Sequence, residues 1–143
     1  MFNRILVPLD GSDNSESALV PAASLAAKYG SSVTLISVML RFPESRIHVP
    51  KLDVQSMDRG NAYLEEVRGR AWDTSIPAEL VVRLGIPADE IVDYAKEAGV
   101  DLIVMCTHGT TGTDRVRHTI GSTAWKILHA APCPILLVPL ATP

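Results

Sequence analysis

The apolar residues of this chain alternate between short continuous runs and stripes with helical spacing. Continuous runs bounded by Gly, Pro, Asp and Ser are typical of strands covered on both faces. Five such runs predict strands at residues 4–8, 32–38, 78–83, 101–106 and 134–138. Helical stripes lie between them, so strand and helix alternate along the chain. This alternation predicts an α/β fold with a parallel sheet built from right-handed crossovers.

Four helices are expected between these strands. The first begins at an apparent capping box, Asp13 with Glu16, and ends at Gly30, and Pro21 inside it is expected to bend it. The others are expected at residues 54–72, between 85 and 99, and at 122–130. Residues 39–54 have no period and predict a loop of a length often found in lids or binding segments.

Size and charge exclude several classes of protein. A chain of 143 residues is expected to form a single domain, residues 1–143. A net charge of −3 argues against nucleic-acid binding, and no apolar run is long enough to predict a membrane span. The N-terminus lacks the apolar core of a signal peptide. Cys106 and Cys133 have no motif spacing and are expected to be buried thiols, which fits a cytoplasmic protein.

The stretch from Val104 to Thr123 carries the strongest signal for a ligand. An apolar strand is followed by a loop with Gly109 and Gly112, and then by Gly121 at the expected start of a helix. Glycines allow close backbone approach, and a helix N-terminus favours an anion such as phosphate. The loop matches neither a Walker A motif nor Gly-x-Gly-x-x-Gly. From composition alone, an ordinary strand–helix connection explains it equally well.

Parallel sheets of this kind bind ligands beyond the carboxyl ends of the strands, where the strand order reverses. The loop after the first strand (8–12) and the loop after the fourth strand (106–121) are predicted to flank that crevice.

Six segments of the chain, taken in order, resemble the universal stress protein family. They are Ile5–Ser12, Gly85–Ala88, Val100–Met105, Thr107–Gly109, Gly121–Ser122 and Ala131–Val138. Together they extend over nearly the whole chain, and six segments in register are strong evidence where one would be weak. The resemblance implies a doubly wound, Rossmann-like fold of the adenine nucleotide α hydrolase type. It also implies a stress-response regulatory function. The expected strand order is 3-2-1-4-5, with four helices.

ATP-binding members of that family have a phosphate loop with the pattern Gly-x2-Gly-x9-Gly-[Ser/Thr]. Gly109 stands at its middle glycine and Gly121-Ser122 at its last pair. Cys106 replaces the first glycine, and eleven residues (110–120) rather than nine separate Gly109 from Gly121. A cysteine side chain narrows the place where a ligand would approach the backbone and disfavours a left-handed conformation.

The resemblance implies an adenine nucleotide as ligand: ATP, ADP or AMP, with or without Mg²⁺. Asp10 corresponds to the acid near the adenine and ribose, and Pro8 and Leu9 would line the base pocket. Val38 would offer backbone groups to the adenine edge, and Met105 would pack beneath the nucleotide. The ribose and phosphates would be held by Gly109, Gly112, Gly121, Ser122 and Thr123.

Several of these residues also have ordinary structural interpretations. Asp10 could cap the first helix, and Ser122 and Thr123 could cap the last one. Arg115 and Arg117 fit a solvated loop pair better than a pair of phosphate ligands. No metal site and no catalytic residue is predicted, because no metal cluster, carboxylate pair or nucleophile–base pair can be assembled from the sequence.

The sequence is compatible with three functions. The first is a regulatory protein whose nucleotide-loaded and empty states differ in partner affinity. The second is an enzyme, for which the loop motifs of ATP pyrophosphatases and adenylyltransferases are absent, although slow ATP hydrolysis stays open. The third is an ATP-independent stress protein that acts through dimerisation, which Cys106 and the longer loop support. The apolar strand from Pro134 to Val138 is expected at a sheet edge, which invites pairing with another strand. The resemblance implies a homodimer that pairs through this strand; the alternative is a monomer whose edge is blunted by Pro134 and Pro139.

Overall fold

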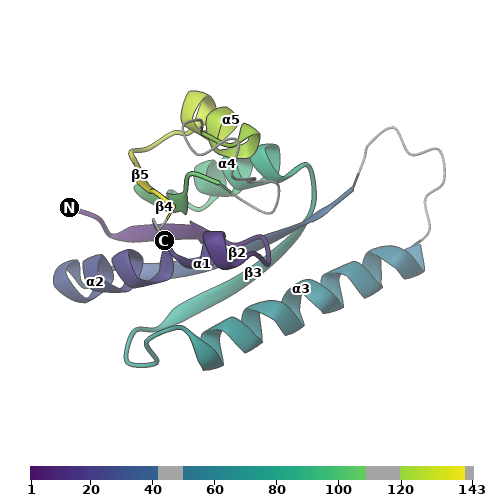
Figure 1. Cartoon of the computed structure of the whole chain (residues 1–143), viewed down its shortest axis with the longest axis horizontal. Coiled ribbons are helices and arrows are strands. Elements are labelled where there is room, and N and C mark those ends of the chain that lie inside the picture. The colour runs from purple at the N-terminus through teal and green to yellow at the C-terminus, as the bar shows by residue number, and fades with distance from the viewer. Residues whose placement is uncertain (42–49, 109–119, 141–143) are drawn as a thin grey trace.

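The chain forms a five-stranded parallel sheet (Figure 1). This computed structural model describes residues 1–41, 50–108 and 120–140. The strands are β1 Arg4–Pro8, β2 Ser32–Leu40, β3 Ala78–Gly85, β4 Leu102–Cys106 and β5 Ile135–Val138. They lie in the order β3-β2-β1-β4-β5, and every pairing is parallel. The predicted fold and strand order are confirmed, and β5 is an edge strand.

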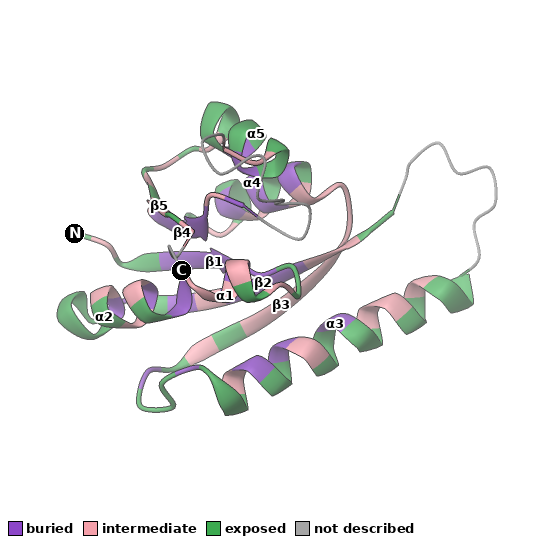
Figure 2. Ribbon diagram, in the orientation of Figure 1, coloured by how far each residue is buried: buried purple, intermediate pink, exposed green. Residues whose placement is uncertain are grey.

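Helices cover both faces of this sheet. They are α1 Asp13–Glu16, α2 Leu19–Tyr29, α3 Pro50–Arg70, α4 Pro87–Glu97 and α5 Ser122–Ala130. In Figure 1, α2 and α3 lie on one side of the sheet, and α4 and α5 lie on the other. Successive residues of β1 enter different cores: Val7 packs with the α2 and α3 side, and Leu6 with the α4 and α5 side. From Ile5 to Pro8 the strand is therefore apolar at every position. Figure 2 shows that its centre is buried.

The first predicted helix is in fact two helices. The expected capping box is wrong, because the N-cap of α1 is Ser12, whose hydroxyl accepts a hydrogen bond from the Ser15 N–H at 3.1 Å. Pro21 lies in the first turn of α2, and the predicted helix is interrupted just before it, between Glu16 and Leu19. A proline cannot donate a hydrogen bond to the carbonyl four residues earlier, and that residue, Ser17, lies in the interruption.

The irregular segment is shorter than predicted. β2 continues to Leu40 and α3 already begins at Pro50, while the remaining residues 42–49 lie outside the described part of the chain. α3 comes close to β3 at Gly60, where an added Cβ would lie 2.6 Å from a Val82 methyl carbon. Glycine is therefore required by the packing of this helix on the sheet.

The expectations drawn from composition have mixed outcomes. Within the described residues, no helix has both the length and the apolar composition needed to cross a bilayer. Both cysteines are free thiols, as expected, but only Cys106 is buried, whereas Cys133 is half-buried.

Candidate functional site

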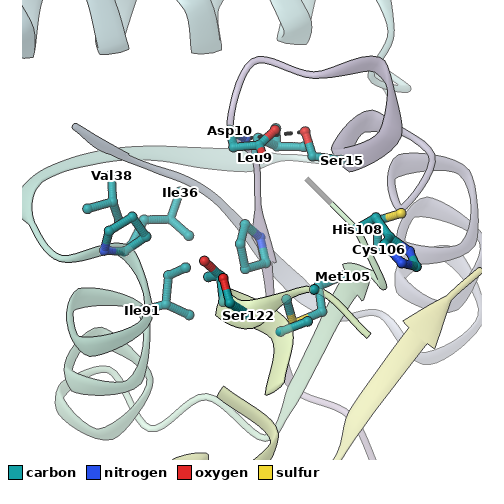
Figure 3. Close-up of a pocket in the computed structure, with 15 residues that line it drawn as sticks. Leu9, Asp10, Ser15, Ile36, Val38, Ile91, Met105, Cys106, His108 and Ser122 are labelled. Carbon is teal, nitrogen blue, oxygen red and sulfur yellow. Dashed lines mark hydrogen bonds between the residues drawn. The ribbon is translucent and has the colours of Figure 1, made fainter. Parts of the chain in front are cut away.

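A cavity of about 250 Å³ opens at the carboxyl end of the sheet, between the loop after β1 and the start of α5 (Figure 3). It lies where the strand order reverses, beside β1 and β4, at the edge predicted to bind a ligand. The predicted residues Gly109 and Gly112 are outside the described residues. The structure brings the other eight of the ten predicted site residues together around this cavity: Pro8, Leu9, Asp10, Val38, Met105, Gly121, Ser122 and Thr123.

The loop after β1 is held by hydrogen bonds among its own residues. The Asp10 carboxylate accepts a hydrogen bond from the Ser12 N–H at 2.9 Å and another from the Ser12 hydroxyl. The Ser15 hydroxyl accepts from the Asp10 N–H at 3.2 Å and donates to the Ser12 carbonyl at 2.9 Å. Asp10 therefore shapes the turn and does not cap α1, because Ser12 is the N-cap. Its side chain remains exposed beside the cavity.

The N-terminus of α5 forms another wall of the cavity. Its N-cap is Gly121, so the expectation that Ser122 or Thr123 caps this helix is wrong, and no side-chain capping hydrogen bond is present. Ser122 and Thr123 are exposed and line the cavity in the first turn of α5. The amide groups of a first helical turn carry a partial positive charge. This wall therefore favours an anion.

Gly121 is needed where the chain enters α5. Its N–H donates to the Thr107 carbonyl at 2.8 Å, which joins the end of β4 to the start of the helix. An added Cβ would lie 3.2 Å from the Thr107 carbonyl oxygen and 3.6 Å from the His108 Cα. The close approach, and not a positive φ (φ is −60°), explains this glycine.

Cys106, which stands at the family's first glycine, ends β4 and is buried against the cavity. No non-glycine residue in the described ranges has a positive φ, so this position is not left-handed in the present chain. The cysteine thus fits the backbone without strain. Figure 3 shows its side chain beside His108. The His108 Nδ1 lies 2.9 Å from the Thr107 hydroxyl.

The sequence interpretation missed an apolar wall on the opposite side. It consists of Ile36 from β2 with Pro87 and Ile91 from α4, and Figure 3 shows Ile36, Val38 and Ile91 close together. The signal was available in the spacing of the residues. Ile36 shares a strand face with Val38, two residues away, and Pro87 and Ile91 are four apart on one helix face. What the spacing could not give was the packing of α4 against that part of the sheet.

The lining combines apolar side chains with few polar groups, as small-molecule sites do. Among the described lining residues, Asp10 is the one carboxylate, and no lysine or arginine is present. Within the same part of the chain, no group of three His, Cys, Asp or Glu side chains could hold a metal ion. The arrangement suits a ligand with an apolar ring and a negatively charged end.

Comparison with known proteins agrees with this geometry. The sequence model of the universal stress protein family matches residues 1–139. The universal stress protein YxiE of Bacillus subtilis is 32% identical to this chain, over 96% of this chain and 99% of that protein.

Solved structures show the same fold. The structure of MJ0577, a protein of Methanocaldococcus jannaschii, has a TM-score of 0.83 and 26% identity, and the match covers 100% of this chain and 99% of that one. A universal stress protein in complex with cAMP has a TM-score of 0.73 at 24% identity, over 96% of this chain and 97% of that one. An Arabidopsis thaliana protein of the family with AMP bound has a TM-score of 0.70 at 15% identity, over 98% and 93%. The chain belongs to the universal stress protein family.

Proposed function

We propose that this protein binds an adenine nucleotide in the cavity between the loops after β1 and β4, and that occupancy changes its contacts with partner proteins. The observation that carries the proposal is the meeting of eight predicted site residues around one cavity at the reversal of strand order. Two proteins of the same fold hold AMP and cAMP, which supports an adenine nucleotide as the ligand class.

Each wall of the cavity has a distinct role in this proposal. The adenine ring packs between Pro8 and Leu9 on one side and the apolar wall of Ile36 and Ile91 on the other. The backbone near Val38 meets the edge of the base, and Asp10 accepts hydrogen bonds from the ribose. The first turn of α5 receives the phosphates, because its amide groups attract negative charge. ATP is the ligand we propose first, with ADP and AMP as weaker ones and Mg²⁺ as a companion of the polyphosphate.

We assign the protein a regulatory rather than an enzymatic role. The function depends on binding and release, so partner contacts are the output. Self-association fits the exposed apolar groups around the edge strand: Leu136 of β5 is 39% exposed, and Trp125 and Leu128 of α5 are 54% and 42% exposed. We therefore propose a homodimer in which two β5 edges pair.

An ATP-independent dimer is the second candidate function. The buried Cys106 at the family's first glycine position favours it, because a cysteine at a lining position leaves less room for a ligand than a glycine.

Calorimetric titration distinguishes the two functions. Protein shown by its ultraviolet spectrum to be free of nucleotide is titrated with Mg-ATP, and separately with Mg-GTP as the control for the base. We expect saturable binding of ATP in the micromolar range and much weaker binding of GTP. No heat with ATP, from folded protein at two temperatures, would favour the ATP-independent function, and equal binding of GTP would contradict an adenine pocket.

A further inference from the structure

Glu16 connects the turn beside the cavity to the middle and the end of α3. Its carboxylate accepts a hydrogen bond from the Tyr63 hydroxyl at 3.0 Å. It also accepts two from the Arg70 guanidinium, at 3.0 and 3.2 Å. The Glu16 side chain is only 12% exposed, so solvent screens this paired contact less than it does most surface pairs. Together these bonds fix the one-turn helix α1 against α3.

The surroundings of Tyr63 keep its hydroxyl protonated. Burial raises the pKa of Tyr63 above its ordinary value, and the hydrogen bond and negative charge of Glu16 raise it further. The Ser15 hydroxyl and the backbone of Gly11 act in the opposite direction on that pKa. Tyr63 therefore stays protonated near neutral pH and donates its hydrogen bond to Glu16.

Ser15 precedes Glu16 in α1 and reaches the cavity. It is 6% exposed, lines the cavity, and accepts the hydrogen bond from the Asp10 N–H. The path from α3 to the cavity thus runs from Tyr63 to Glu16 by one hydrogen bond, along the backbone of α1 to Ser15, and from Ser15 to Asp10 by a second hydrogen bond. A four-residue helix has little stability of its own, so its position depends on such contacts.

We propose that Tyr63 and Glu16 are positioning residues of the nucleotide site: they hold α1 against α3 and so keep the turn Asp10–Ser15 in its ligand-facing shape. This inference rests on the proposed function. Neither side chain is among the residues lining the cavity, so both act through Ser15 and Asp10. By linkage, nucleotide bound at Asp10 also tightens α1 against α3.

Tyr63→Phe tests the proposal, because it removes the hydroxyl and keeps the ring in the core. We expect ATP affinity to fall about five-fold, the value of roughly one hydrogen bond. The matched control is Tyr94→Phe, which removes a hydroxyl 3.5 Å from Thr34, away from the cavity lining. Affinities are measured well below the unfolding temperature of each variant, so that a loss of stability alone leaves them unchanged.

A double-mutant cycle with Asp10→Asn separates positioning from a general structural role. If Tyr63 acts through Asp10, Tyr63→Phe costs less than two-fold once Asp10→Asn is present. An affinity for the Tyr63→Phe variant within two-fold of the Tyr94→Phe control would overturn the inference and leave the proposed function standing. Additive losses in the cycle would also overturn it. Failure of the unmodified protein to bind any adenine nucleotide would overturn both.

Discussion

Replacement of Thr123 by glutamate tests the assignment of phosphates to the first turn of α5. Thr123 is exposed, lines the cavity and follows the N-cap Gly121 by two residues. A carboxylate at this position repels a bound phosphate, but it also interacts favourably with the positive end of the helix. Nucleotide binding should therefore weaken while the fold becomes slightly more stable. This opposite pair of effects cannot come from misfolding.

The size of the effect follows from simple electrostatics. Two unit charges about 6 Å apart repel by about 3 kcal/mol at an effective dielectric constant of about 20. Screening at this solvent-exposed position reduces the value to about 1–2 kcal/mol, which is about 5- to 30-fold in ATP affinity. The charge at the helix N-terminus should raise the free energy of unfolding by about 0.3–1 kcal/mol.

The assay is calorimetric titration of the Thr123→Glu and Thr123→Gln variants, together with their thermal unfolding. Glutamine has the same shape without the charge, so the ratio of the two affinities isolates the electrostatic effect. Adenosine, which carries no phosphate, should bind both variants equally. Equal ATP affinities for the two variants, or an equal loss for adenosine, would refute the placement of phosphates at α5.

The remaining predictions concern stability. Gly60→Ala should destabilise the fold by about 1–2 kcal/mol, because the new Cβ would lie 2.6 Å from a Val82 methyl carbon. In the same helix, Gly69→Ala should be neutral or stabilise the fold by up to about 1 kcal/mol, because its Cβ would have no atom within 4 Å. Urea unfolding of both variants measures the sign of each change. Asp101→Ala should cost about 1–3 kcal/mol, because Asp101 accepts hydrogen bonds from the N–H groups of residues 3 and 4 at 2.8 and 3.0 Å; an unchanged urea midpoint would contradict this. Since burial and Glu16 raise the pKa of Tyr63 in the folded state, its contribution to stability is complete below the unfolded pKa of about 10 and declines as pH rises above it. Tyr63→Phe should accordingly lose less stability between about pH 9.5 and 11 than the unmodified protein does, and parallel stability curves would argue against it.

Local sequence signals were sufficient for most of the fold. Continuous apolar runs mark strands buried on both faces, and Gly30, with a φ of +64°, ends α2 as its position after an apolar stripe predicts. The start of the first helix was misplaced by one residue because Asp13 and Glu16 mimic a capping box, whereas the N-cap is Ser12. Glu16 instead pairs with Tyr63 and Arg70, 47 and 54 residues away, and no local pattern predicts such contacts.

The candidate site was predictable to a similar degree. Residues at strand ends, such as Asp10 and Met105, follow from topology, because the carboxyl ends of parallel strands meet at one edge. The wall from Ile36 and Ile91 depends on how α4 packs against β2, which requires three-dimensional information. Residues 109–119 lie outside the described part of the chain, so the predicted roles of Gly109 and Gly112 remain predictions.

The most direct test of the central claim is a map of backbone amide chemical shifts as Mg-ATP is added to the nucleotide-free protein. We predict the largest changes at Leu9, Asp10 and Ser15 and at Ser122–Ala124, which line the cavity, with little change at the amino ends of the strands. Changes confined to β5 or to the far end of the sheet, or no changes at saturating ATP, would contradict nucleotide binding at this site.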